Sequence, residues 1–281
     1  MIDLHMHTTL SDEELKVEQL LEKLEQANVE VFSITDHNHA LAYKHFNVED
    51  YNVITGSEVA TSFKGVIIEI LLYNIDPDII NEWYYDFYSD SNLEKIEELL
   101  FSDIIELGKN NDYKVSDDLK LEKIEKGYAK KKVYHDLVSN NPGFPFETYK
   151  HFFRKGLSNP ESNFFIDEGR TYPSIKEVVD LAKKAGGIAI LAHPYEYGVN
   201  IDDLKQLVLD YNLDGMESFH PSATVVNSLE ILDFCEANNL KSSMGSDYHK
   251  TSRRVPIGVH VFRPLLEYKA YNWIKELSNK S

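Results

Sequence analysis

The chain has 281 residues, 42% of them hydrophobic and 27% charged, an ordinary composition for a folded chain with a sizeable core. Its formal net charge is −18. Such an acidic surface repels a phosphate backbone, so we expect no extended duplex binding unless metal ions or a local basic patch reverse the field. There is no apolar run long enough to span a membrane and no secretory pattern before the first strand, so the expected location is the cytoplasm.

Short apolar runs alternate with amphipathic helical patterns along most of the chain. The predicted strands are residues 2–4, 31–34, 53–55, 66–72, 188–191, 215–217, 242–244 and 258–262. The predicted helices are residues 14–27, 174–185, 202–211, 225–238 and 265–277. A repeated strand-then-helix order predicts parallel strands with crossover helices, in a number that suits a closed barrel. The single cysteine, Cys235, falls in a helical pattern and is expected to be a core residue.

Residues 77–170 interrupt this order. They are polar, aromatic and helix-patterned, for example over 93–107 and 130–137, with a turn at 140–145. We therefore predict a helical insertion domain at 77–170 and a main domain formed by 1–76 and 171–281. The aromatic run at 83–88 indicates either a base-stacking cleft or the small domain's own core.

Two histidines, His5 and His7, alternate along the first predicted strand, which sends both imidazoles to one face. Asp12 follows after a polar turn and is placed to reach a neighbouring ion. Because the chain has 11 histidines, this pair alone is weak evidence for a metal site. Similar side chains recur where the other predicted strands end: Asp36 and His37, Glu58, His193, Glu217 and His220, and Asp247 and His249. Glu69 lies inside an apolar run, where a carboxylate needs a cation.

Five motifs carry a resemblance to a known family: D-L-H-M-H-T at 3–8, I-T-D-H-N at 34–38, G-S-E at 56–58, L-A-H-P at 191–194 and G-S-D-Y-H at 245–249. Their order and spacing resemble those of the PHP (polymerase and histidinol phosphatase) family. The A-G-G-x-x-x-x-A-H-P form of residues 185–194 is similar to that of its insertion-bearing metal-dependent phosphoesterases. The resemblance implies a distorted (β/α)7 TIM-like barrel, two or three divalent ions, and hydrolysis of a phosphoester by a metal-bridged hydroxide.

The resemblance also implies a ligand set. One ion takes His5, His7, Glu58 and Asp247. A second shares Glu58 and adds Glu69 and His193. A third takes Asp12, His37 and His249. Glu69 departs from the family, which usually has histidine there, and a carboxylate favours manganese or magnesium over zinc. The expected ions are Mn²⁺, Fe²⁺ or Zn²⁺, with Mg²⁺ also compatible.

Other side chains are expected around these ligands. His193, His220 or His249 would protonate the leaving alkoxide, and His220 either contacts substrate or makes a supporting hydrogen bond. Asp36 is expected to orient His5 or His37. Arg170 and Arg253 are candidates for phosphate binding, whereas Lys250 and Arg254 fit a solvated basic loop. The remaining histidines are expected in solvated or packing roles: His39, His45, His135, His151 and His260.

The leading functional interpretation is a phosphoesterase acting on a small phosphomonoester, with a nucleotide or a 3′,5′-bisphosphonucleotide favoured by the resemblance. The alternatives are a 5′–3′ exonuclease on short oligonucleotides, a histidinol phosphatase, and a non-catalytic metal-binding module. The expected partner is a phosphorylated metabolite or nucleotide, with neither duplex nucleic acid nor a membrane. Hydrolysis of p-nitrophenyl phosphate with added manganese separates the enzymes from the binding module.

Overall fold

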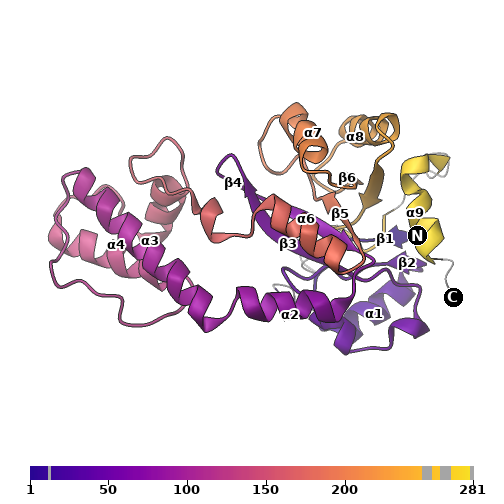
Figure 1. The fold of residues 1–281 in the computed structure, drawn as a ribbon, viewed down its shortest axis with the longest axis horizontal. Helices are drawn as coiled ribbons and strands as arrows, with labels where there is room; N and C mark the ends of the chain where they lie inside the picture. The colour runs from indigo at the N-terminus through magenta and orange to yellow at the C-terminus, as the bar shows by residue number, and fades with distance from the viewer. Residues whose placement is uncertain (12–13, 249–254, 260–266, 279–281) are drawn as a thin grey trace. The chain divides into compact units, whose positions relative to one another are not determined.

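The computed structural model describes residues 1–11, 14–248, 255–259 and 267–278 (Figure 1). The chain divides into two compact units. The first unit comprises Met1–Tyr84 and Tyr172–Ser281, and the second comprises Tyr85–Thr171. Helix α2 (Pro77–Phe87) begins in the first unit, so the boundary between the units falls within this helix and not at its start.

The first unit is a mixed α/β structure with two sheets. A parallel pair joins β1 (Ile2–Asp3) to β2 (Val31–Phe32). The five-stranded sheet has its strands in chain order: β3 (Gly56–Phe63), β4 (Val66–Tyr73), β5 (Ile188–Leu191), β6 (Gly215–Phe219) and β7 (Lys241–Met244). Isolated bridges, among them Met6–Tyr248 and His37–Glu58, connect the two sheets. Among the described residues, regular strand pairing does not run all the way round.

The prediction of uniformly parallel strands is wrong for β3, β4 and β5, because β4 runs antiparallel to both of its neighbours. The cause is a two-residue hairpin turn at Lys64 and Gly65, whose φ angles are 50° and 79°. Two successive positive φ angles match the natural twist of a hairpin. A strand at 53–55 is also wrong: Val53 makes only an isolated bridge to Phe32, and the strand starts at Gly56.

The predicted helices of the first unit are confirmed, four of them with ends shifted by at most three residues, whereas the last begins at Asn272 and not at residue 265. They are α1 (Val17–Gln26), α6 (Ile175–Lys184), α7 (Ile201–Asp210), α8 (Val225–Ala237) and α9 (Asn272–Ser278). The start of α6 is fixed by a capping box, in which Ser174 Oγ accepts from the Glu177 backbone N–H and Glu177 accepts from Ser174. Of the last predicted strand, Val259 pairs with Ile2, and 260–262 lie outside the described residues. Within the described ranges, no helix has the length and apolar character that a bilayer crossing needs.

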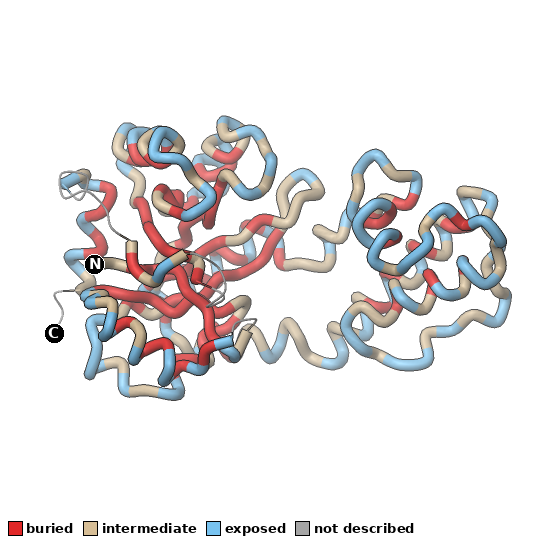
Figure 2. The backbone as a smooth tube through the Cα atoms, turned by 180° about the vertical axis from the view of Figure 1, so that it is seen from behind, coloured by how far each residue is buried: buried red, intermediate tan, exposed pale blue. Residues whose placement is uncertain are grey.

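The core of the first unit lies along its sheets, where Figure 2 shows the buried chain segments. Both faces of the chain after β1 are covered, since Leu4, His5, Met6 and His7 are all fully buried. Apolar side chains on one face hold this segment in the core, so the two imidazoles on the other face have fixed positions. Cys235 is buried in α8, which confirms its predicted packing role.

The second unit has its own core. It contains α3 (Asp90–Asn110), α4 (Tyr128–Asn140), α5 (Tyr149–His151) and a π-helical turn, Phe152–Leu157. Leu100, Ile104 and Phe152 are among its buried side chains. Two residues of the aromatic run at 83–88 lie outside this core, since Trp83 packs against the core of the first unit and the ring of Tyr84 against His39.

Candidate metal centre

Glu58 lies at the centre of a buried cluster of imidazoles. Its Oε1 atom is 3.2 Å from His5 Nε2 and 2.9 Å from His193 Nε2. Its Oε2 atom is 3.4 Å from His7 Nε2 and 3.2 Å from His37 Nδ1. One carboxylate therefore faces four histidines from separate segments of the sequence.

Two more carboxylates complete the cluster from opposite sides. Asp247 Oδ1 lies 3.4 Å from His5 Nε2 and 3.3 Å from His7 Nε2. Glu69 lies with Oε1 3.5 Å from His37 Nδ1 and Oε2 3.3 Å from His193 Nε2. Asp247 has a positive φ of 47°, and its backbone N–H donates to the His5 carbonyl at 2.8 Å. Left-handed backbone in a non-glycine residue is costly, and here it aims a carboxylate at the cluster.

The spacing of these atoms fits divalent ions. Ligands about 2.1 Å from an ion lie about 3.0 Å apart in an octahedron and about 3.4 Å apart in a tetrahedron. The nitrogen-to-oxygen distances in this cluster run from 2.9 to 3.5 Å. The buried Nε2 atom of His5 makes no hydrogen bond within the described part of the chain. Imidazole nitrogens and carboxylate oxygens without hydrogen bonds are the donor set that Zn²⁺, Mn²⁺ and Fe²⁺ accept.

The electrostatics of the buried cluster also favour cations. Burial alone lowers the pKa of His5, but the carboxylates of Glu58, Glu217 and Asp247 outweigh it and raise the pKa well above its usual value. The pKa of His193 is raised in the same way, mainly by its hydrogen bonds to Glu58 and Glu69 against the effect of burial. Since imidazole binds a metal only when neutral, ion binding displaces these protons.

Comparison with known proteins shows which proteins this chain resembles in sequence. No family model matches the chain. It is 28% identical over 259 residues to a 5′–3′ exoribonuclease of Haemophilus influenzae, covering 88% of this chain and 89% of that protein. It is 27% identical over 269 residues to the phosphoribosyl 1,2-cyclic phosphate 1,2-diphosphodiesterase of Eggerthella lenta, covering 90% and 96%.

Two solved structures share the fold. An amidohydrolase of Chromobacterium violaceum has a TM-score of 0.60 at 18% identity, covering 98% of this chain and 96% of that one. A metal-dependent phosphoesterase of Bifidobacterium adolescentis has a TM-score of 0.57 at 20% identity, covering 94% and 95%. Over most of its length the chain is similar to proteins named as a metal-dependent phosphoesterase and a phosphodiesterase. The curated relatives are named for cleavage of phosphoester bonds, which agrees with the phosphoester hydrolase that the motifs predicted.

The sequence placed Glu217 at the end of a predicted strand but gave it no specific role in the centre. Its Oε1 atom lies 3.1 Å from His5 Nδ1, and its Oε2 atom accepts the His193 backbone N–H at 2.8 Å. A carboxylate on Nδ1 fixes the tautomer of His5 and turns Nε2 toward Glu58. The available signal was a glutamate at the end of the predicted strand 215–217, although in the structure it is the middle residue of β6.

Replacing Glu217 by glutamine is expected to weaken metal binding by about 10- to 100-fold, because the neutral amide no longer holds the His5 tautomer. Competition with a fluorescent chelator measures this affinity. Glu25→Gln, on the exposed side of α1, is the matched control and should bind metal as the wild type does. Equal affinities in both variants would contradict the orienting role.

Asp36 was predicted to orient His5 or His37, and this is wrong. Its carboxylate accepts from the Thr8 backbone N–H at 2.6 Å, from Thr8 Oγ1 at 2.8 Å and from Ser11 Oγ at 2.8 Å. Asp36 therefore fixes the turn that follows His7, and it acts on the centre through the backbone instead of through a ring.

Several predicted site residues lie away from this cluster or outside the described residues. Arg170 forms an ion pair with Asp103 inside the second unit, so its phosphate-binding role stays a prediction. His220 does reach the cluster, with Nε2 at 3.3 Å from Asp247 Oδ2. The following lie outside the described residues: Asp12, His249, Lys250, Arg253, Arg254 and His260.

Proposed function

We propose that this PHP-type phosphoesterase removes nucleotides from the 5′ end of short RNA oligonucleotides in a reaction that depends on divalent metal ions. The carrying observation is Glu58, whose two oxygens face four imidazoles within 3.4 Å. The substrate class is supported by the likeness to a protein named 5′–3′ exoribonuclease over most of both chains.

The proposed ligand sets follow the distances. His5, His7, Glu58 and Asp247 would hold one ion. Glu58, Glu69 and His193 would hold a second ion. His37, a predicted ligand of the third ion, also faces Glu58 and Glu69. When bound, divalent ions polarise a phosphoryl oxygen and lower the pKa of a coordinated water. With Glu69 in the set, we expect activation by Mn²⁺ and Mg²⁺ as well as by Fe²⁺ or Zn²⁺.

His220 is the proposed proton donor to the leaving alkoxide. Its Nδ1 atom lies 2.7 Å from Ser222 Oγ, which holds the ring with Nε2 toward the Asp247 carboxylate. His193 is less suited to this task, because its Nε2 atom already faces both Glu58 and Glu69. A histidine held at the edge of the cluster can move a proton without leaving a ligand position empty.

A small phosphomonoester or 3′,5′-bisphosphonucleotide is the second candidate substrate. It is favoured by the likeness to a diphosphodiesterase whose named substrate is a single phosphoribosyl unit. Turnover measured against RNA lengths from one nucleotide upward separates the two. Rising kcat/KM with chain length supports the oligonucleotide, and a maximum at one nucleotide supports the small substrate.

We further infer that the two sheets are arcs of one distorted barrel. The bridges Met6–Tyr248 and His37–Glu58 each run parallel and join the short pair to opposite edges of the five-stranded sheet. In such a barrel the ligands would share one rim.

His7→Ala is expected to abolish hydrolysis, because it removes a nitrogen that faces both Glu58 and Asp247. Metal content by mass spectrometry and turnover of p-nitrophenyl phosphate with manganese are the measurements. His45→Ala, at an exposed position, is the control. Wild-type turnover and metal content in His7→Ala would show that the ligand assignment is wrong.

A further inference from the structure

We propose that the second unit carries a binding surface for single-stranded RNA, a basic-aromatic strip formed by Lys131, Tyr149, Lys150, Phe153 and Arg154. This inference rests on the proposed function, because it supplies the oligonucleotide to which that reaction is applied. It concerns the surface of one unit alone and needs no particular arrangement of the two units.

The acidic charge of the chain is unevenly distributed. Residues 85–171 hold 13 of the 29 lysines and arginines but only 17 of the 47 aspartates and glutamates. Between Tyr128 and Lys155 there are six basic residues and two acidic ones, Asp136 and Glu147. Asp136 is engaged by the backbone N–H and hydroxyl of Ser116. This segment has a net positive charge and attracts a phosphate backbone, which the acidic remainder of the chain repels.

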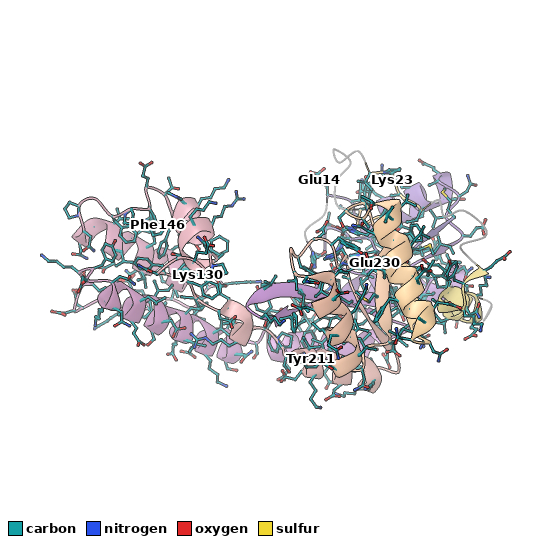
Figure 3. The ribbon with its side chains drawn as sticks, turned by 90° about the horizontal axis from the view of Figure 1, so that it is seen from above. Glu14, Lys23, Lys130, Phe146, Tyr211 and Glu230 are labelled. Atoms are coloured by element: carbon teal, nitrogen blue, oxygen red, sulfur yellow. The ribbon has the colours of Figure 1, made fainter. Side chains whose placement is uncertain are left out.

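Two aromatic rings lie in the middle of the strip. Tyr149 and Phe153 are one turn apart, with ring centroids separated by 6.4 Å, and Phe153 is 36% exposed. The ammonium of Lys131 lies 5.8 Å from the Tyr149 ring centroid, and Figure 3 labels its neighbour Lys130, whose ammonium lies 5.1 Å from the Phe153 ring. Tyr149 is partly buried, so the exposed Phe153 ring beside these cations offers an unpaired base the main face on which to stack.

The cations of the strip remain available. Lys130 pairs with Glu168 at 2.6 Å and Lys132 with Glu122 at 3.0 Å. Within the described ranges no ion pair involves Lys131, Lys150 or Arg154, and all three are exposed. Lys150 directly follows Tyr149 in α5, and Arg154 directly follows Phe153 in the π-helical turn.

A single strand fits these features better than a duplex or a lipid surface. A duplex hides the faces of its bases, so the exposed Phe153 ring would have no base to stack on. Binding to an anionic membrane needs a larger apolar face. Among the described residues, Phe153 is the only side chain of the strip that is large, hydrophobic and exposed. Alternating cations and rings match the alternation of phosphates and bases.

The test is the affinity of the full-length protein for 5′-phosphorylated octaadenylate carrying a 3′ fluorophore, measured by anisotropy in EDTA to prevent turnover. Lys150→Glu combined with Arg154→Glu should weaken binding by about tenfold or more. The same variant should lower the slope of log affinity against log salt by about 1.4, because it no longer neutralises two phosphates of the strand. Phe153→Ala should weaken binding by about tenfold, because a base can no longer stack there, with little change in the salt slope.

The matched control reverses two exposed lysines outside the strip, Lys114→Glu with Lys120→Glu. It has the same net charge as the strip variant and should bind the probe nearly as tightly as the wild type. All three variants should hydrolyse p-nitrophenyl phosphate at the wild-type rate.

Equal weakening in the strip and control variants would overturn the proposal, because binding would then follow net charge alone. Absence of binding by the wild type, or tighter binding to phosphatidylserine vesicles than to the RNA, would overturn it as well. Binding is measured without metal, so strip-dependent binding by a protein with no hydrolytic activity would contradict the proposed reaction and leave the surface assigned.

Discussion

Replacing Glu58 by glutamine is expected to reduce phosphoester hydrolysis by roughly a thousandfold or more and to remove bound metal. Each Glu58 oxygen faces two imidazoles, so one substitution alters the surroundings of four ring nitrogens at once. Those imidazoles hold the pKa of Glu58 well below its usual range against the effect of burial. The glutamine amide brings no negative charge, and one of its ends presents N–H groups to the positions the ions would occupy.

Metal stoichiometry by mass spectrometry and single-turnover kinetics with saturating manganese measure this effect. The control is Glu196→Gln, a half-exposed glutamate 3.9 Å from His220 Nδ1. It keeps every close approach to Glu58 and should retain most activity and full metal content. If Glu58→Gln binds metal as the wild type does, Glu58 is not the shared ligand.

The sequence predicted the members of the described cluster because each follows or interrupts an apolar run. His5 and His7 follow β1, His193 follows β5 and Asp247 follows β7, where local pattern alone places a side chain at the end of a parallel strand. The element that carries Glu58 differs from the one the sequence predicted. It is the third residue of β3 and not part of a loop after 53–55.

What the sequence left unassigned depends on contacts between distant segments. Glu217 and His5 are 212 positions apart, and nothing near Glu217 in the chain indicates which nitrogen it contacts. Asp36 was assigned to a ring because histidines are its neighbours in sequence, whereas the fold brings Thr8 and Ser11 closer. The Lys64-Gly65 turn could have indicated that β4 runs antiparallel to β3. The apolar pattern of a strand alone does not indicate its direction.

Gly245→Ala is expected to disrupt the centre without changing a ligand. A Cβ atom at this position would lie 2.1 Å from His5 Cβ and 2.6 Å from the His5 backbone nitrogen. Rotation of a side chain cannot relieve these clashes, so the segment after β7 must move away from the segment after β1. Those two segments carry Asp247 and His5, and their separation would open the 3.4 Å approach between the two side chains.

We expect Gly245→Ala to lose about 1–3 kcal/mol of folding free energy, the usual cost of overpacking, and to lose metal binding under conditions where the protein is still folded. Urea unfolding and metal titration on the same sample measure the two effects.

Gly127→Ala is the control. Gly127 has a φ of 77° with nothing within 4 Å of an added Cβ, so backbone strain of about 1–2 kcal/mol should lower the stability of this variant and leave the centre intact. Comparable destabilisation in both variants, with metal binding abolished only in Gly245→Ala, would attribute the effect to the displacement of His5 from Asp247. Retained metal binding in Gly245→Ala would mean that these two segments can separate without opening the site, and that Asp247 is not held as a ligand by its contact with the segment after β1.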